Sequence, residues 1–328
     1  MDWLTAVHLA SYNGHVDITW LLIDHSADVS AQNKDGWTAL HLASEHGHVD
    51  FARILIEHGA NMSAQNEDGW TVLHSASYNG HFNLARTLVE LNADVSAQNK
   101  DRLTMLHLAS YNSHADLACM LIELGTDMSA QNKDGWTPLH LTLEHGHADF
   151  AWMLIEHGAS VSAQNKDGWT PLHSASYNSH LDLVWMLIEH GANVSAQNKD
   201  GATILHLASY NGNVDLARML TEHGADVSAQ NKDGWTALHL TSEHGHIDLA
   251  QMLIECGTDV SSQNKDGWTA LHSASYNGHV DLAQMLVECG TSMSAQTKSR
   301  WTPLHLASEN RHVGLARMLV ECSTNMAP

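Results

Sequence analysis

The sequence is poor in basic residues and contains no long apolar segment. Lysine and arginine together number 15 against 37 aspartates and glutamates, which gives a net charge of −22 with histidine neutral. Because nucleic-acid phosphates are bound by cationic surfaces, this balance argues against a nucleic-acid partner and favours a basic protein or peptide. No apolar run approaches the roughly 20 residues that cross a bilayer, so we expect no membrane span. The first residues also lack the basic and apolar segments of a signal peptide.

Cysteine is scarce as well, and its spacing argues against a disulfide framework. The four cysteines, Cys119, Cys256, Cys289 and Cys322, form no Cys-x-x-Cys pair. We therefore expect reduced thiols and a cytoplasmic protein, with the nucleus as the alternative compartment. Hydrophobic residues make up 43% of the chain, which is enough to bury a core and argues against a disordered chain.

What the sequence has in abundance is repetition. The tetrapeptide Thr-x-Leu-His, once Thr-x-Val-His, recurs every 33 residues without an insertion. Its histidines are His8, His41, His74, His107, His140, His173, His206, His239, His272 and His305. Self-similarity at this period is typical of a solenoid, in which one unit is too small to bury its own apolar face and stacks on its neighbours.

Each repeat predicts two short helices joined by turns, as the second repeat illustrates. Asp35-Gly36 is a turn signal, and Thr38 is a suitable N-cap for a helix over residues 39–44. Gly47 can end that helix with a positive φ. A second helix with apolar residues at helical spacing then runs to Gly59.

These motifs, with Thr-Pro-Leu-His at 137–140 and Gly47-His48 among them, resemble the ankyrin repeat over essentially the whole chain. The resemblance implies an all-α solenoid of paired antiparallel helices, stacked into a curved array with β-turn fingers projecting at right angles. It also implies that the Thr-x-Leu-His imidazole hydrogen-bonds the backbone between neighbouring fingers. We expect one array over residues 1–328, with its ten repeats starting at residues 2, 35, 68, 101, 134, 167, 200, 233, 266 and 299.

A longer period of 99 residues is superimposed on the short one. In successive repeats, the two residues before the Gly-His turn follow the order Tyr-Asn, Glu-His, Tyr-Asn. A set of residues at the same position of every repeat is here called a column, and this column holds all six tyrosines. A turn tryptophan follows the same order: the first, fourth and seventh repeats lack it and carry Leu4, Leu103 and Ala202 instead. We interpret this pattern as the tandem copying of a three-repeat unit, beginning at residues 2, 101 and 200, with a partial fourth unit at 299.

Aromatic and acidic side chains in the variable columns predict a binding surface in the concave groove that the resemblance implies. Trp and Tyr dominate protein interfaces, and a Trp face beside carboxylates suits Lys or Arg through cation–π contacts of about 0.5–2 kcal/mol. The predicted partner-binding residues are Trp37, Trp70, Trp136, Trp169, Trp235, Trp268, Tyr78, Tyr111, Tyr177, Tyr210, Glu144 and Asp167. In the alternative interpretation, each Trp only stacks on the next finger and stiffens the row, at roughly 0.5–1.5 kcal/mol per contact.

The 27 histidines predict neither catalysis nor metal binding. Most of them occupy fixed positions of the repeat, and the three in the groove, His46, His145 and His244, are three repeats apart, roughly 30 Å at ordinary helix spacing. These three cannot share one metal ion. The sequence has no Ser-His-Asp arrangement, phosphate loop or HExxH motif. We therefore expect no catalytic residue, no cofactor and no metal.

The expected function is that of a non-catalytic scaffold that binds a basic protein or peptide in its groove. The sequence of the repeats resembles fungal ankyrin arrays, which adds the expectation that the chain is the recognition part of a larger receptor. The alternatives are an enzyme or small-molecule binder that uses the Trp- and His-lined groove, and a passive spacer. We expect a monomer, with Trp152 and Trp185 on the outer face of neighbouring repeats as a candidate site of weak self-association.

Overall fold

The structure is a computed structural model that describes residues 4–325 as helices joined by loops. Over these residues it holds 20 helices and no β-strand, with two isolated β-bridges, Gln32 to Thr38 and Gln197 to Thr203. The chain divides into two compact units, Met1–Lys166 and Asp167–Pro328. The predicted all-α class is confirmed. The predicted start of the first repeat at residue 2 lies outside the described residues.

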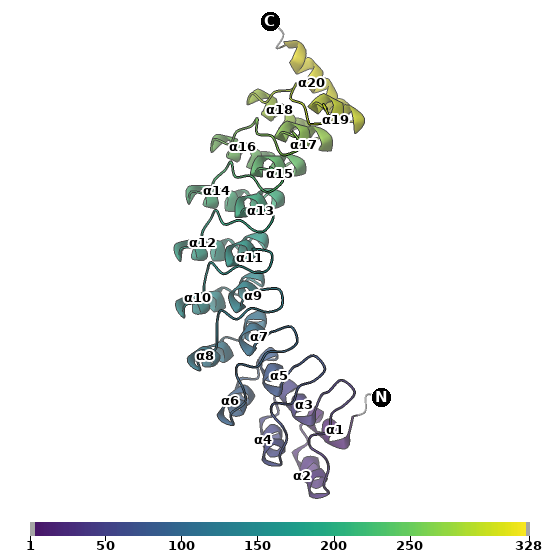
Figure 1. Ribbon diagram of the computed structural model, residues 1–328, viewed down its shortest axis with the longest axis vertical. Coiled ribbons are helices and arrows are strands. Elements are labelled where there is room, and N and C mark those ends of the chain that lie inside the picture. The colour runs from purple at the N-terminus through teal and green to yellow at the C-terminus, as the bar shows by residue number, and fades with distance from the viewer. Residues whose placement is uncertain (1–3, 326–328) are drawn as a thin grey trace. The chain divides into compact units, whose positions relative to one another are not determined.

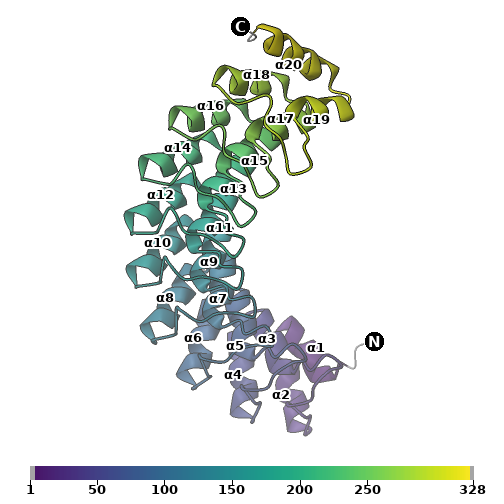
Figure 2. The same cartoon turned by 45° about the horizontal axis from the view of Figure 1, so that its top comes forward.

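The N-terminal unit contains helices α1 to α10, drawn in purple to teal in Figure 1. The first helix of each pair, here called the inner helix, packs against the inner helices of the neighbouring pairs, and the second, outer helices form a row beside them (Figures 1 and 2). The helices are α1 (Ala6–Asn13), α2 (Val16–Asp24), α3 (Ala39–Glu45), α4 (Val49–Glu57), α5 (Val72–Tyr78), α6 (Phe82–Glu90), α7 (Met105–Asn112), α8 (Ala115–Glu123), α9 (Pro138–Glu144) and α10 (Ala148–Glu156).

The C-terminal unit repeats this arrangement with helices α11 to α20. Figure 2 shows the long finger loops of this unit on the inner-helix side, away from the outer helices. The helices are α11 (Pro171–Tyr177), α12 (Leu181–Glu189), α13 (Ile204–Asn211), α14 (Val214–Glu222), α15 (Ala237–His244), α16 (Ile247–Glu255), α17 (Ala270–Asn277), α18 (Val280–Glu288), α19 (Pro303–Glu309) and α20 (Val313–Asn325).

Each inner helix begins at the threonine of the repeated tetrapeptide. In α3, Thr38 is the N-cap, and its Oγ1 accepts a hydrogen bond from the His41 N–H at 3.3 Å. The helix ends at Glu45, one residue beyond the predicted boundary, and Gly47 then turns the chain at φ 73°. Glycine adopts such a φ without the steric cost of a side chain, which explains its frequency at this turn. Ser113 takes the same position in the fourth repeat at φ 60°.

The core of each unit lies between its inner and outer helices and between successive pairs. In the second repeat, Leu40 and Leu55 are fully buried, and Phe51 is 1% exposed. Ala43 and Ala52 are also completely buried, and their small side chains allow the helices to approach closely. Truncation of one such leucine to alanine costs about 2–5 kcal/mol. Because much of this burial is contributed by the neighbouring pairs, the stack and not the single repeat is the stable unit.

Candidate functional site

Each finger is shaped by an asparagine at its base. In the finger where the eighth repeat meets the ninth, Asn264 Oδ1 accepts hydrogen bonds from the backbone N–H groups of Asp266 and Trp268, both at 2.9 Å. The Asn264 N–H in turn donates to the Trp268 carbonyl at 2.8 Å. Asparagine stabilises turns in this way by bonding to the backbone a few residues ahead. The backbone of the turn tryptophan, here also called the corner tryptophan, is therefore fixed, and its indole projects from a defined place on the finger.

Successive fingers are joined by backbone hydrogen bonds. The Lys265 N–H donates to the Asp233 carbonyl at 2.9 Å, and the Lys298 N–H donates to the Asp266 carbonyl at 2.8 Å. A Cβ at Gly234 would lie 2.9 Å from the Lys265 nitrogen, so glycine allows this approach without displacing the neighbouring backbone. The spacing of the fingers, and with it the spacing of the corner indoles, is thus set by main-chain contacts.

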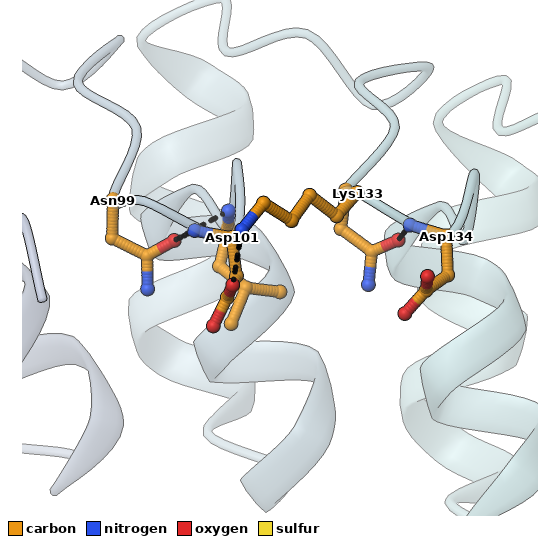
Figure 3. A network of polar contacts seen from close by, with 6 residues as sticks. Asn99, Asp101, Lys133 and Asp134 are labelled. Atoms are coloured by element: carbon orange, nitrogen blue, oxygen red, sulfur yellow. Dashed lines mark hydrogen bonds and ion pairs between the residues drawn. The ribbon is translucent and has the colours of Figure 1, made fainter.

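The finger of the fourth repeat keeps this geometry without the glycine. Figure 3 shows that Asn99 Oδ1 accepts from the Asp101 N–H at 3.0 Å and that Lys133 Nζ reaches the Asp101 carboxylate at 3.2 Å. Arg102 replaces glycine at φ 60°, a conformation that costs roughly 1–2 kcal/mol for a residue with a side chain. Both partners of the Lys133–Asp101 pair are more than half exposed, so the pair stabilises the finger by at most about 1 kcal/mol.

The histidine of the tetrapeptide joins its own helix to the next finger. His239 Nδ1 accepts from the Thr236 N–H at 3.2 Å, and its Nε2 lies 2.9 Å from the Trp268 carbonyl. Since a carbonyl only accepts and a backbone N–H only donates, the ring is fixed as the neutral Nε2–H tautomer. Burial lowers the pKa of His239, and the bond to the Trp268 carbonyl acts in the opposite direction. The predicted imidazole bond to a neighbouring finger is confirmed.

The histidine after the turn glycine has a structural role that the sequence pattern did not predict. His279 Nε2 donates at 3.0 Å to the carbonyl of Glu243 in α15, the inner helix of the preceding repeat, and His312 Nε2 donates to the Tyr276 carbonyl at 2.9 Å. A Cβ at Gly245 would lie 2.6 Å from the His279 ring, so glycine also makes room for the imidazole. Each donor and acceptor are 36 residues apart. Only the recurrence of Gly with His at this turn could have indicated the contact.

The tyrosine and tryptophan columns meet on the finger side of the inner helices. The tyrosines are between 41% and 54% exposed, whereas the predicted corner tryptophans are half-buried. The Trp268 and Tyr276 rings lie edge to face with centroids 5.6 Å apart, and Trp70 and Tyr78 do the same at 5.5 Å. We call the surface formed by these two columns in each unit the inner face.

Two cavities open on the inner face of the C-terminal unit. The smaller has a volume of about 250 Å³, and its principal lining residues are Trp235, Glu243, Asp266, Trp268 and Tyr276. The larger, of about 520 Å³, shares three of these residues and extends to Trp301, Leu306, Lys298 and Glu309. Each cavity is therefore lined by indoles from successive fingers and by one tyrosine. Carboxylates from fingers and helix ends line the same space.

The other predicted site residues lie at equivalent places in their own repeats. Trp37, Trp70 and Trp136 are half-buried in the N-terminal unit, as is Trp169 in the C-terminal unit. Tyr78 stacks on Tyr111 at 6.5 Å, Trp169 lies 5.5 Å from Tyr177, and Tyr210 lies 4.6 Å from His244. Glu144 and Asp167 are exposed. The cavity residues Glu243, Tyr276 and Trp301 were not among the predicted set, although they occupy the same sequence columns.

The outer face presents a different surface. Trp20, Trp152 and Trp185 are 42%, 49% and 52% exposed there. A hollow of about 630 Å³ between α6 and α8 is lined by Phe82 and Cys119 among others. Across the described residues, no cluster of three His, Cys, Asp or Glu side chains could hold a metal ion. No helix in residues 4–325 combines the length and the apolar character that a bilayer crossing requires.

Comparison with known proteins gives one consistent result. A family model described as "Ankyrin repeats (3 copies)" matches residues 2–66, 60–132, 106–198, 193–264 and 242–327. These overlapping matches extend over nearly the entire chain. No curated protein matches the sequence significantly.

Proposed function

The chain belongs to the ankyrin-repeat family, and from this premise we propose that it is a non-catalytic scaffold that binds a basic protein or peptide on its inner face. Ankyrin repeats generally mediate protein–protein interaction. The observation that carries the proposal is the cavity in which Trp235, Trp268 and Tyr276 stand beside Glu243 and Asp266. Aromatic faces next to carboxylates attract cationic side chains. The net charge of −22 favours encounters with a basic partner.

The repeated histidines support a non-catalytic role. In His41 and His206, Nδ1 bonds to the capping threonine and Nε2 bonds to the carbonyl of the next finger. A general base needs a ring nitrogen within reach of the substrate, and both nitrogens of these rings are occupied. The near-identical three-repeat units also fit the recognition part of a larger receptor, since added repeats extend a binding surface without a new fold.

Selection from a random peptide library against the purified full chain tests this proposal. We expect the selected peptides to be enriched in Lys and Arg and to bind more weakly as the salt concentration rises. The double variant Trp235→Ala/Trp268→Ala should weaken their binding by at least about tenfold, because buried aromatic anchors dominate interfaces. Fluorescence anisotropy of the labelled peptides measures the dissociation constants.

Trp185→Ala is the matched control, since Trp185 is half-exposed on the outer helix α12. It should leave peptide binding unchanged, and circular dichroism should show that every variant keeps its helices. Selected peptides without an excess of basic residues would contradict the proposed partner. Loss of binding in the Trp185 variant, with binding kept in the double variant, would place the site on the outer face instead.

A further inference from the structure

The smaller cavity of the inner face has the composition of a receptor for a single cationic side chain. Its aromatic walls come from two successive fingers through Trp235 and Trp268 and from the α17 residue Tyr276. Glu243 and Asp266 supply two carboxylates, and no Lys, Arg or His lines the cavity. The neighbouring larger cavity differs, because Lys298 is part of its lining. A volume of about 250 Å³ suits one long side chain rather than a folded segment.

The remaining lining residues hold this cavity in shape. Asn264 fixes the Trp268 backbone through its Oδ1, as described above for the finger. Asn277 Nδ2 donates to the Ser273 carbonyl at 3.1 Å, which places its amide against its own helix. The finger carrying Trp235 is linked to that of Trp268 by the bond from Lys265 N–H to the Asp233 carbonyl. The cavity is therefore built before any ligand arrives, which lowers the entropic cost of binding.

The same residues, with the same aromatic pair, recur in the N-terminal unit. All eight residues that line the cavity recur 198 positions earlier, with Trp37, Glu45, Asp68, Trp70 and Tyr78 as the counterparts of the five principal ones. The aromatic pair has the same geometry, with 5.5 Å and 69° between the Trp70 and Tyr78 rings against 5.6 Å and 62° in the C-terminal unit. Asn79 Nδ2 likewise donates to the Ser75 carbonyl, at 2.9 Å. The sequence carries the eight residues a third time within 136–178.

We infer that the C-terminal cavity and its counterpart in the N-terminal unit, together called the two compartments, each take one arginine side chain of the bound segment, an inference that rests on the proposed function. A guanidinium is planar, stacks on indole and phenol faces, and donates paired hydrogen bonds to carboxylates. The C-terminal cavity offers both features at once through Trp268 and Glu243, and the equivalent residues of the N-terminal unit are Trp70 and Glu45. An ammonium group is more strongly hydrated and lacks the flat face, so lysine is the weaker ligand.

Site-resolved NMR of the whole 328-residue chain tests this inference. The probes are three capped pentapeptides of glycine with arginine, lysine or citrulline in the centre, and the signals are the tryptophan indole N–H resonances. The arginine peptide should shift Trp70 and Trp268 in a saturable manner and leave the outer-face Trp185 unchanged. We expect the lysine peptide to bind at least about threefold more weakly and citrulline, which is isosteric but neutral, at least about tenfold more weakly.

The two compartments serve as controls for each other. Glu243→Gln should weaken the shift of Trp268 by about tenfold and leave that of Trp70 unchanged, and Glu45→Gln should do the reverse. Asp266→Asn, which alters the second carboxylate of the same cavity, should also weaken only the Trp268 response. Equal binding of the arginine and citrulline peptides would overturn this inference. A Trp268 response that neither Glu243→Gln nor Asp266→Asn changes would overturn it as well.

Failure of this inference can be separated from failure of the proposed function. Binding of library-selected basic peptides could be lost in Trp235→Ala/Trp268→Ala but unchanged in Glu243→Gln and Asp266→Asn. In that case the inner face binds basic segments and the inference of an arginine site is wrong. If the arginine peptide shifts Trp268 while the library yields no basic segment, the arginine compartment is supported and the proposed partner is wrong.

Discussion

At the scale of single residues, the buried serines of the inner helices carry a free-energy cost. Ser44, Ser77 and Ser209 are fully buried, and their hydroxyl oxygens lack a hydrogen-bond partner. A buried hydroxyl without a partner costs about 1–3 kcal/mol. The position requires a side chain that fits among packed inner helices, and it also accepts an apolar one, because Leu143 occupies it in the fifth repeat with no exposure.

The variant Ser209→Ala should therefore stabilise the protein. It removes the unpaired oxygen and leaves almost the same volume, so we expect the free energy of unfolding to rise by about 1 kcal/mol. For a unit of this size the melting temperature should increase by about 2–4 °C. Chemical denaturation followed by circular dichroism measures the change. Ser228→Ala, at an exposed serine, should change stability by less than about 0.5 kcal/mol. A fall in stability in Ser209→Ala would mean that its hydroxyl is bonded after all.

At the scale of the helices, the inner and outer members of a pair are stabilised differently. The inner helix α15 has a side-chain cap at Thr236, and the paired His239 ring completes a reciprocal pair of bonds at its first turn. The outer helix α16 has no side-chain cap bond at its start, where the N-cap is His246, and carries Asp248 in its first turn. The short inner helix thus begins through local hydrogen bonds, whereas the outer helix depends on packing and on the favourable charge of Asp248.

Thr236→Ala should consequently weaken the protein, and Thr236→Ser should restore most of the loss. Alanine cannot accept from the His239 N–H or bond to the His239 ring, both of which Thr236 does. We expect a loss of about 1–2 kcal/mol for alanine and a much smaller loss for serine, which keeps the hydroxyl. Urea denaturation of the two variants measures the difference. Equal losses in both would show that the methyl group of Thr236, and not its hydroxyl, matters.

At the scale of the whole molecule, the column of buried histidines makes the fold sensitive to acid. Burial lowers the pKa of His74, His107 and His173 to about 4, below the usual value of about 6.5 in an unfolded chain. Between these values the unfolded state binds more protons than the folded state, so acid favours unfolding. The stabilisation is complete above pH 6.5 and is lost as the pH falls towards 4. Its size is on the order of 3 kcal/mol per histidine.

We therefore expect the melting temperature to be nearly constant between pH 8 and pH 7 and to fall steeply from about pH 6.5 downwards. Differential scanning calorimetry in buffers from pH 8 to pH 4 measures this profile. Carboxylates begin to contribute only near their own pKa values of about 4. A melting temperature that stays constant down to pH 5 would contradict a neutral, buried histidine column.

The local rules of the repeat were readable from the sequence because they depend on neighbours a few residues apart. Thr38 as a cap, Gly47 at a positive φ and the apolar spacing of the outer helix each act within one turn. The proposed binding surface was only partly predictable from the sequence. The repeat positions that hold Trp235, Trp268, Glu243 and Tyr276 were identified, but Glu243 and Tyr276 were not named as site residues, because their proximity to Trp268 depends on how fingers and helix ends stack.

The sequence by itself determined the repeat length, the helix pairs and the family, because a 33-residue period repeated ten times leaves few other ways to bury the apolar faces. The tertiary structure decided which distant atoms meet. His279 bonds to a carbonyl 36 positions before it, and Trp235 and Trp268 line one cavity although a whole repeat separates them. Such contacts arise from the distance between stacked repeats and the direction of each side chain, and neither quantity is written in the local pattern of residues.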